Sequence, residues 1–257
     1  MLLRRVVEHV RRQEWTAIGI DFVIVVVGVF IGIQVSNWND ERLRATTAET
    51  YIERIREDLR ANLGDLRERV AYFSQVRTNA LGVLEALDQP RETLGEQFLI
   101  DAYQASQMLP RTLGRDTYDE ILSVGANDAI ANVPIRNRLA NFYRSVEALL
   151  VLLQPETQYR NSIRALMPYA VQASIRMACD EITDTSSTGE PIISLPASCD
   201  PDLAPEDIAA AVDAILEQDI RHDLTRRITD LDLKLGALQL MIERVSLLNA
   251  YLENASR

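Results

Sequence analysis

The sequence predicts an all-α protein, in which one N-terminal transmembrane helix precedes a periplasmic helical bundle with long first and last helices. Two observations predict this fold. A long apolar stretch lies near the N-terminus, and apolar residues then recur at steps of three and four along most of the remaining chain. Steps of this size mark one face of an α-helix. No later segment shows the alternation of a β-strand, so we expect no strands.

The apolar stretch is "WTAIGIDFVIVVVGVFIGIQVSNWND", residues 15–40. Its core of twelve residues without a polar side chain, 22–33, by itself fits a signal-peptide core or a buried helix. Its flanks favour a membrane span, because Trp15 and Trp38 lie 23 residues apart, roughly 34 Å along a helix and close to the spacing of the two interfacial aromatic belts. We predict an uncleaved span over 15–38 with these tryptophans as anchors. A cleaved signal, which would need an A-x-A site, and a core helix are the alternatives.

The arginines near the span predict its orientation. Four of them, Arg4, Arg5, Arg11 and Arg12, precede the span, and two, Arg42 and Arg44, follow it closely. Positive residues favour the cytoplasmic side of a membrane. Residues 1–14 are therefore predicted to lie in the cytoplasm and residues 39–257 in the periplasm, which places the protein in a bacterial inner membrane.

The two cysteines, Cys179 and Cys199, flank a segment rich in Ser, Thr, Gly and Pro, which predicts an irregular loop at about 181–204. A disulfide closing a loop of about 21 residues is worth ~3 kcal/mol in the chain-entropy model and forms in oxidising compartments, in agreement with a periplasmic domain. Two unrelated buried thiols or a zinc pair are the alternatives. Zinc is disfavoured because both histidines, His9 and His222, are distant in sequence.

The net charge of the chain is −11, and it is unevenly distributed. Residues 1–45 hold six arginines against five acids, which leaves 21 basic and 33 acidic residues in 46–257. An acidic domain is repelled by phosphate backbones. The sequence therefore argues against nucleic-acid binding.

Prolines and glycines divide the predicted domain into helices. The span is expected to continue as one amphipathic helix to about residue 87, since no proline precedes Pro90. The last helix is expected over 220–252 and antiparallel to the first. Between them we predict helices at about 92–108, from 116, at 132–154 with Asn132 as N-cap and Pro134 in its first turn, at 156–180 with a kink at Pro168, and from 205 to about 218.

No catalytic motif stands out in the sequence. It contains no G-x-S-x-G elbow, no P-loop, no H-E-x-x-H and no Gly-rich nucleotide fingerprint. Acid pairs such as Glu57–Asp58 lie in helices with polar solvent faces. We therefore predict a protein that is not an enzyme and has no catalytic residues, cofactor or metal, and we rank a hydrolase a distant third among the functions.

Two blocks of sequence resemble an uncharacterised family of bacterial single-span membrane proteins. The first is "DFVIVVVGVFIGIQVSNWNDER", in which an acidic residue precedes the span and an N-W-N-[ED] motif follows it. The second is "TYDEILSVGANDAIANVPIRNRLANFY", residues 117–143. The resemblance implies a membrane location and a helical build, and it implies no active site.

One face of the span carries small residues and an acid. Its members follow one another at steps of four, three, four and three: Asp21, Val25, Gly28, Gly32 and Val35. A G-x-x-x-G pair lets two membrane helices approach closely. Asp21 has three readings, namely a solvated boundary residue, a polar contact with a partner span, and an ion-relay carboxylate.

These features predict a non-enzymatic inner-membrane protein whose periplasmic bundle scaffolds or binds protein partners. It would act as a homo-oligomer or as an accessory subunit of a membrane complex, with the lipid bilayer and a protein as partners. The alternative is a proton-relay or sensory subunit in which Asp21 titrates and the first helix transmits motion.

Overall fold

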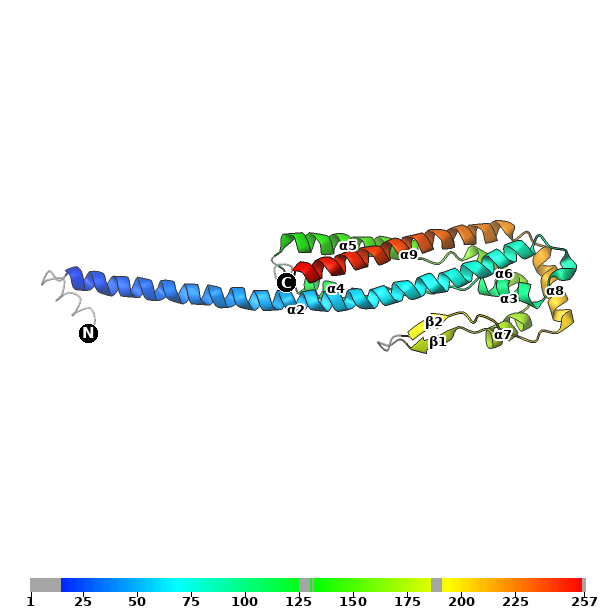
Figure 1. The fold of residues 1–257 in the computed structure, drawn as a ribbon, viewed down its shortest axis with the longest axis horizontal. Helices are drawn as coiled ribbons and strands as arrows, with labels where there is room; N and C mark the ends of the chain where they lie inside the picture. Colours follow the sequence, from blue (N-terminus) through cyan, green and yellow to red (C-terminus); the bar gives the residue numbers. More distant parts are fainter. Residues whose placement is uncertain (1–14, 125–129, 131, 186–190, 256–257) are drawn as a thin grey trace.

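The computed structural model describes residues 15–124, 130, 132–185 and 191–255, with side chains from Ile18 onward. These residues are mostly α-helical, so the prediction of an all-α protein is confirmed at the level of fold class. Their two strands form one short hairpin. Figure 1 shows a long first helix that extends alone over its first half and is covered by the other elements over its second half.

The first helix, α2 (Trp15–Ala86), is a single uninterrupted helix of 72 residues. It spans roughly 108 Å at 1.5 Å per residue. Its second half follows a strict alternation of four-residue and three-residue steps between buried positions: Ile55, Leu59, Asn62, Leu66, Arg69, Phe73, Val76, Ala80 and Val83. This pattern keeps one face of the helix turned towards its neighbours. The helix ends at Ala86, one residue before the predicted end at about residue 87.

The last helix, α9 (Arg221–Ala255), packs along the second half of α2 and runs in the opposite direction (Figure 1). Two ion pairs join the two helices, Arg56 to Glu253 and Arg77 to Asp232, and a third joins Arg221 of α9 to Asp88 in the turn after α2. Its buried residues also alternate by three and four, at Leu224, Arg227, Leu231, Lys234, Leu238, Met241, Val245, Leu248 and Leu252. The apolar periodicities of the two helices predict this antiparallel packing.

A third long helix, α5 (Val133–Leu152), packs against α9. Its start is as predicted, because the Asn132 side chain accepts a hydrogen bond from the Ile135 amide at 3.2 Å and proline lies in the first turn. It runs antiparallel to α9, since Lys234 donates to the Gln154 carbonyl at 2.9 Å near one end and Arg138 stacks on Tyr251 near the other. The core between these helices also includes α4 (Asp116–Ser123).

A second apolar core lies around the end of α2 at Ala86. It is formed by α3 (Glu96–Gln104), α6 (Gln158–Leu166), α7 (Tyr169–Ala178) and α8 (Pro205–Leu216), and the 3-10 turn η1 (Arg91–Thr93) precedes α3.

Two helix boundaries in this second core differ from the prediction. The helix expected at 92–108 covers only α3, because Gly95 adopts an extended conformation and acts as its N-cap. The helix expected at 156–180 is two helices, because Pro168 takes an extended conformation and becomes the N-cap of α7 instead of kinking a single helix.

The connection between α3 and α4, residues 105–115, has no regular secondary structure and mixes exposed positions with buried ones such as Leu109 and Leu113. Side chains satisfy its backbone groups. Arg227 donates to the carbonyls of Ala105 and Gln107 at 3.2 and 2.6 Å, and Arg69 donates to those of residues 111 and 112 at 3.1 and 3.2 Å. Asn62 bonds both the amide and the carbonyl of Gly114. Buried polar side chains on α2 and α9 thus replace the hydrogen bonds that a helix would have supplied.

The segment between the cysteines contains a hairpin, which corrects the prediction of an irregular loop at about 181–204 and of no strands. β1 (Ile182–Thr185) pairs antiparallel with β2 (Pro191–Ser194). The hairpin forms because α2 supplies partners for its backbone: Gln75 bonds both the amide and the carbonyl of Leu195 at 3.0 Å, and Glu68 accepts from the Ile193 amide.

Candidate functional site

The first half of α2 is long and apolar enough to cross a membrane, and it is the one such helix among the described residues. Its most apolar window has a mean hydropathy of 2.5, and none of that window is buried within the chain. A core helix would be covered by other elements, so the core-helix alternative does not fit this structure. The exposed surface is the part of the molecule that most requires an external partner, either lipid or protein.

The predicted contact face lies within this exposed half. Val25 and Val35 are 64% and 57% exposed, and a Cβ atom added at Gly28 or Gly32 would meet no atom within 4 Å. Asp21 is exposed and forms no ion pair with another described residue. All five residues of the face lie on one unbroken helix, so a second helix could approach the face without obstruction from this chain.

The two tryptophans mark the predicted ends of the span. The backbone is helical from Trp15 through Trp38, which sets them roughly 34 Å apart along the axis. The Trp38 side chain is 64% exposed, as an interfacial residue requires, and the Trp15 side chain lies outside the described part.

A lone helical stalk connects the apolar half of α2 to the packed half. Residues 39–50 are exposed at every position except the partly buried Ala48, and partly buried positions begin again at Tyr51. Three threonines on the stalk donate their hydroxyls to carbonyls one turn earlier, among them Thr46 to Arg42 at 3.1 Å. Twelve residues of helix correspond to about 18 Å. The domain is thereby held at a distance from the predicted span.

Cys179 and Cys199 form a disulfide with a Cα–Cα distance of 5.3 Å, so the predicted bridge is confirmed. The bond joins the end of α7 to the segment before α8. Gln104 donates to the carbonyl of Cys179 at 2.8 Å, which ties the bridge to α3. Its role in this arrangement is to hold the base of the hairpin segment against the second core.

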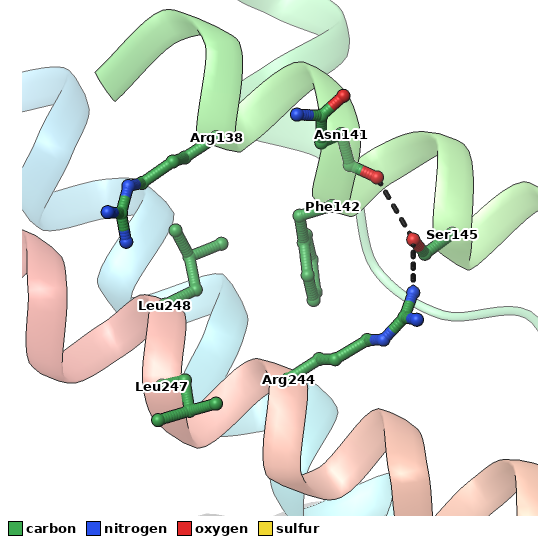
Figure 2. Close-up of a pocket in the computed structure, with 7 residues that line it drawn as sticks. All are labelled: Arg138, Asn141, Phe142, Ser145, Arg244, Leu247 and Leu248. Atoms are coloured by element: carbon green, nitrogen blue, oxygen red, sulfur yellow. Dashed lines mark hydrogen bonds between the residues drawn. The ribbon is translucent and has the colours of Figure 1, made fainter. Parts of the chain in front are cut away.

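The structure adds a feature that sequence reasoning missed, an open groove of about 240 Å³ between α5 and α9. Figure 2 shows Phe142 in its middle, with Arg138 and Arg244 on either side. Arg244 donates to the Ser145 hydroxyl at 2.6 Å, and Ser145 donates to the Asn141 carbonyl at 3.0 Å. The other lining residues are Leu247 and Leu248. The described lining residues thus combine an apolar floor with two cations, and none of them is a carboxylate.

A line of exposed leucines on α9 leads into this groove. Leu233, Leu240 and Leu247 are 60%, 51% and 72% exposed and follow one another at seven-residue steps. None of these three leucines is a buried residue of α9, and none belongs to the apolar positions at steps of three and four that the sequence predicted for this helix. Their regular spacing was visible in the sequence and is the signal that could have predicted this surface.

Two buried ionisable side chains, Arg69 and Arg227, bond the backbone of the connection at 105–115, and a third, Lys234, bonds the Gln154 carbonyl. Burial lowers the pKa of the Arg227 guanidinium, and the nearby Asp230 opposes that shift. Burial also raises the pKa of Tyr72, and its hydrogen bond to Glu181 acts in the same direction. Within the described ranges, no three His, Cys, Asp or Glu side chains converge in a way that could hold a metal ion. Arg227 and Tyr72 thus have structural partners that account for their positions.

Comparison with protein-family models, with curated proteins and with solved structures finds no significant match to this chain. The resemblance to single-span membrane proteins therefore stays a prediction.

Proposed function

We propose that this chain is a single-span protein of the bacterial inner membrane, with its helical domain in the periplasm, and that it scaffolds or binds protein partners without catalysing a reaction. It acts as a homo-oligomer or as an accessory subunit of a membrane complex. One observation carries the proposal: the same unbroken helix is buried by α9 over its second half and fully exposed and apolar over its first. The exposed half needs a bilayer, and its glycine face is shaped for a second helix.

The glycine face supplies a direct test. Gly28→Ile or Gly32→Ile places bulk on the face, holds the backbones of two spans apart and forfeits interhelical contacts, so either change should weaken association. Val26→Ile, about 200° around the helix from Gly28, is the matched control and should change little. The measurement is an in-membrane association assay. Equal association of the glycine variants and the Val26 variant would contradict the proposed close packing at the glycine face.

Purification of the intact protein in mild detergent, followed by mass spectrometry, separates the two forms of the proposal. A stable complex with other proteins supports the accessory subunit, and a pure homo-oligomer supports self-assembly. A monodisperse monomer with no companion in both detergent and lipid nanodiscs would contradict both.

A second candidate function is signal transmission or proton relay through Asp21. The continuity of α2 favours it, because a helix without a break between span and domain passes on a rotation or a shift of either end. Asp21→Asn keeps the shape and hydrogen bonding of the side chain and removes its charge. A contact role of Asp21 would largely survive this change, whereas loss of complex activity with retained association would favour the relay.

A further inference from the structure

The groove between α5 and α9 concentrates positive charge in an acidic protein. Ten arginines of the described residues form ion pairs with carboxylates, for example Arg115 with Glu147, which occupies the one acid on α5. Arg138 and Arg244 are not among the ten, and none of the described residues that line the groove is a carboxylate. Their charges are therefore available to an external anion.

The guanidinium groups of Arg138 and Arg244 are each held in place by an uncharged side chain, which leaves their positive charges in place. Arg138 lies over the Tyr251 ring at 3.7 Å from its centroid, and Arg244 is fixed by its hydrogen bond to Ser145. Arg138 and Ser145 lie seven residues apart on α5, and Arg244 and Tyr251 lie seven residues apart on α9, so the two contacts are separated by about 10 Å, or two helical turns, along the helix pair. Phe142 and Leu248 form the apolar floor between them (Figure 2).

The apolar surface extends beyond the groove along α9. Leu233 and Leu247 are separated by fourteen residues, so the leucine line is about 21 Å long. A small anion would leave most of this line exposed to water. An elongated ligand with an apolar side and acidic flanks would cover the line and neutralise both arginines.

We propose that the α5–α9 groove binds an acidic amphipathic helix of a partner protein. The helix would present two carboxylates seven residues apart, one to Arg138 and one to Arg244, and apolar side chains between them to the floor formed by Phe142 and Leu248. Seven residues match the two-turn separation of the arginine anchors. This inference deepens the proposed scaffolding role and rests on it, because it specifies the chemistry of the partner.

The test uses the full chain in nanodiscs of zwitterionic lipid and a fluorescent alanine-based peptide as the probe. The peptide carries two glutamates seven positions apart, with leucines at the third and fourth positions after the first glutamate. Anisotropy should report binding that weakens about tenfold with Arg138→Glu or Arg244→Glu, since each change replaces a charge-assisted contact by repulsion. Arg226→Glu, which changes an exposed α9 arginine away from the groove that bonds Gln158, is the control and should shift the affinity less than about twofold.

A charge exchange makes the test specific. A peptide with lysines in place of both glutamates should bind the Arg138→Glu/Arg244→Glu protein and not the unchanged protein. The proposal is overturned if a glutamine version binds as well as the glutamate version, or if the arginine variants bind the acidic probe unchanged. It is also overturned if anionic vesicles or a second copy of the chain occupy the groove instead of the probe. None of these outcomes affects the co-purification result, so a failure here is distinguishable from a failure of the scaffolding role.

Discussion

At the scale of single residues, two buried arginines act as hydrogen-bond donors to backbone carbonyls. Arg69 and Arg227 are 1% and 3% exposed, and each donates to two carbonyls of the connection at 105–115. Unpaired buried carbonyls would each cost free energy on folding. Arg69 of α2 and Arg227 of α9 therefore help to determine the path of a connection that is distant from at least one of them in sequence.

This role predicts a contrast between two neighbouring arginines on α9. Arg227→Met leaves the carbonyls of Ala105 and Gln107 without donors and should lower the free energy of unfolding by about 3 kcal/mol. Arg226→Met changes an exposed side chain that bonds only Gln158, so its effect should stay within about 0.5 kcal/mol. Urea unfolding of the full chain in detergent, followed by circular dichroism, measures both. Similar losses for the two variants would contradict the clamping role of Arg227.

At the scale of elements, α2 tolerates glycine at positions with different surroundings. A Cβ atom at Gly64 would meet nothing within 4 Å, whereas a Cβ atom at Gly82 would lie 2.9 Å from the Asp101 carboxylate on α3. Gly64 thus has no packing reason to lack a side chain. Gly82 makes room for the close approach of α3.

Alanine substitutions should separate these two glycines. Gly64→Ala should stabilise the protein by about 1 kcal/mol, because alanine has the higher helix propensity and nothing obstructs its methyl group. Gly82→Ala gains the same propensity but forces the Asp101 side chain to move, so it should be neutral or destabilising. Thermal unfolding of the two variants beside the unchanged chain gives the comparison. A stabilisation at Gly82 as large as that at Gly64 would argue against the contact with α3.

At the scale of the whole molecule, the disulfide links the fold to the compartment in which it forms. The bond closes the segment that carries the hairpin, and the hairpin docks on α2 far away in sequence. Such a bond persists in an oxidising compartment and is rare in the cytosol. Its state in cells therefore reports on which side of the membrane the domain lies.

We expect Cys179 and Cys199 to be joined in growing cells. Alkylation of free thiols in intact, untreated cells, followed by non-reducing electrophoresis, should leave both cysteines unlabelled until a reductant is added. Replacing both by serine should cost about 3 kcal/mol of stability, the value for a loop of this length. Full labelling of both cysteines without reductant would contradict the periplasmic assignment.

The sequence predicted features that depend on local or periodic signals. The extents of α2 and α9 follow from apolar residues repeated over many turns, and the start of α5 follows from Asn132 and Pro134 alone. The hairpin could not be predicted in this way, because its four-residue strands are held by Glu68 and Gln75, more than a hundred residues earlier. The groove depends on the register of α5 against α9, which no local pattern contains. The contact face of the span was predicted as a set of residues, and no described element of the chain covers it.

The unbroken stalk has a mechanical consequence. In a bilayer, a membrane helix adjusts its tilt to the thickness of the hydrocarbon layer. From the middle of the proposed span to Ala86, α2 measures about 90 Å, so a change of about 10° in tilt would carry its far end sideways by about 15 Å. On the proposed topology, membrane thickness would then set the lateral position of the second core relative to the span.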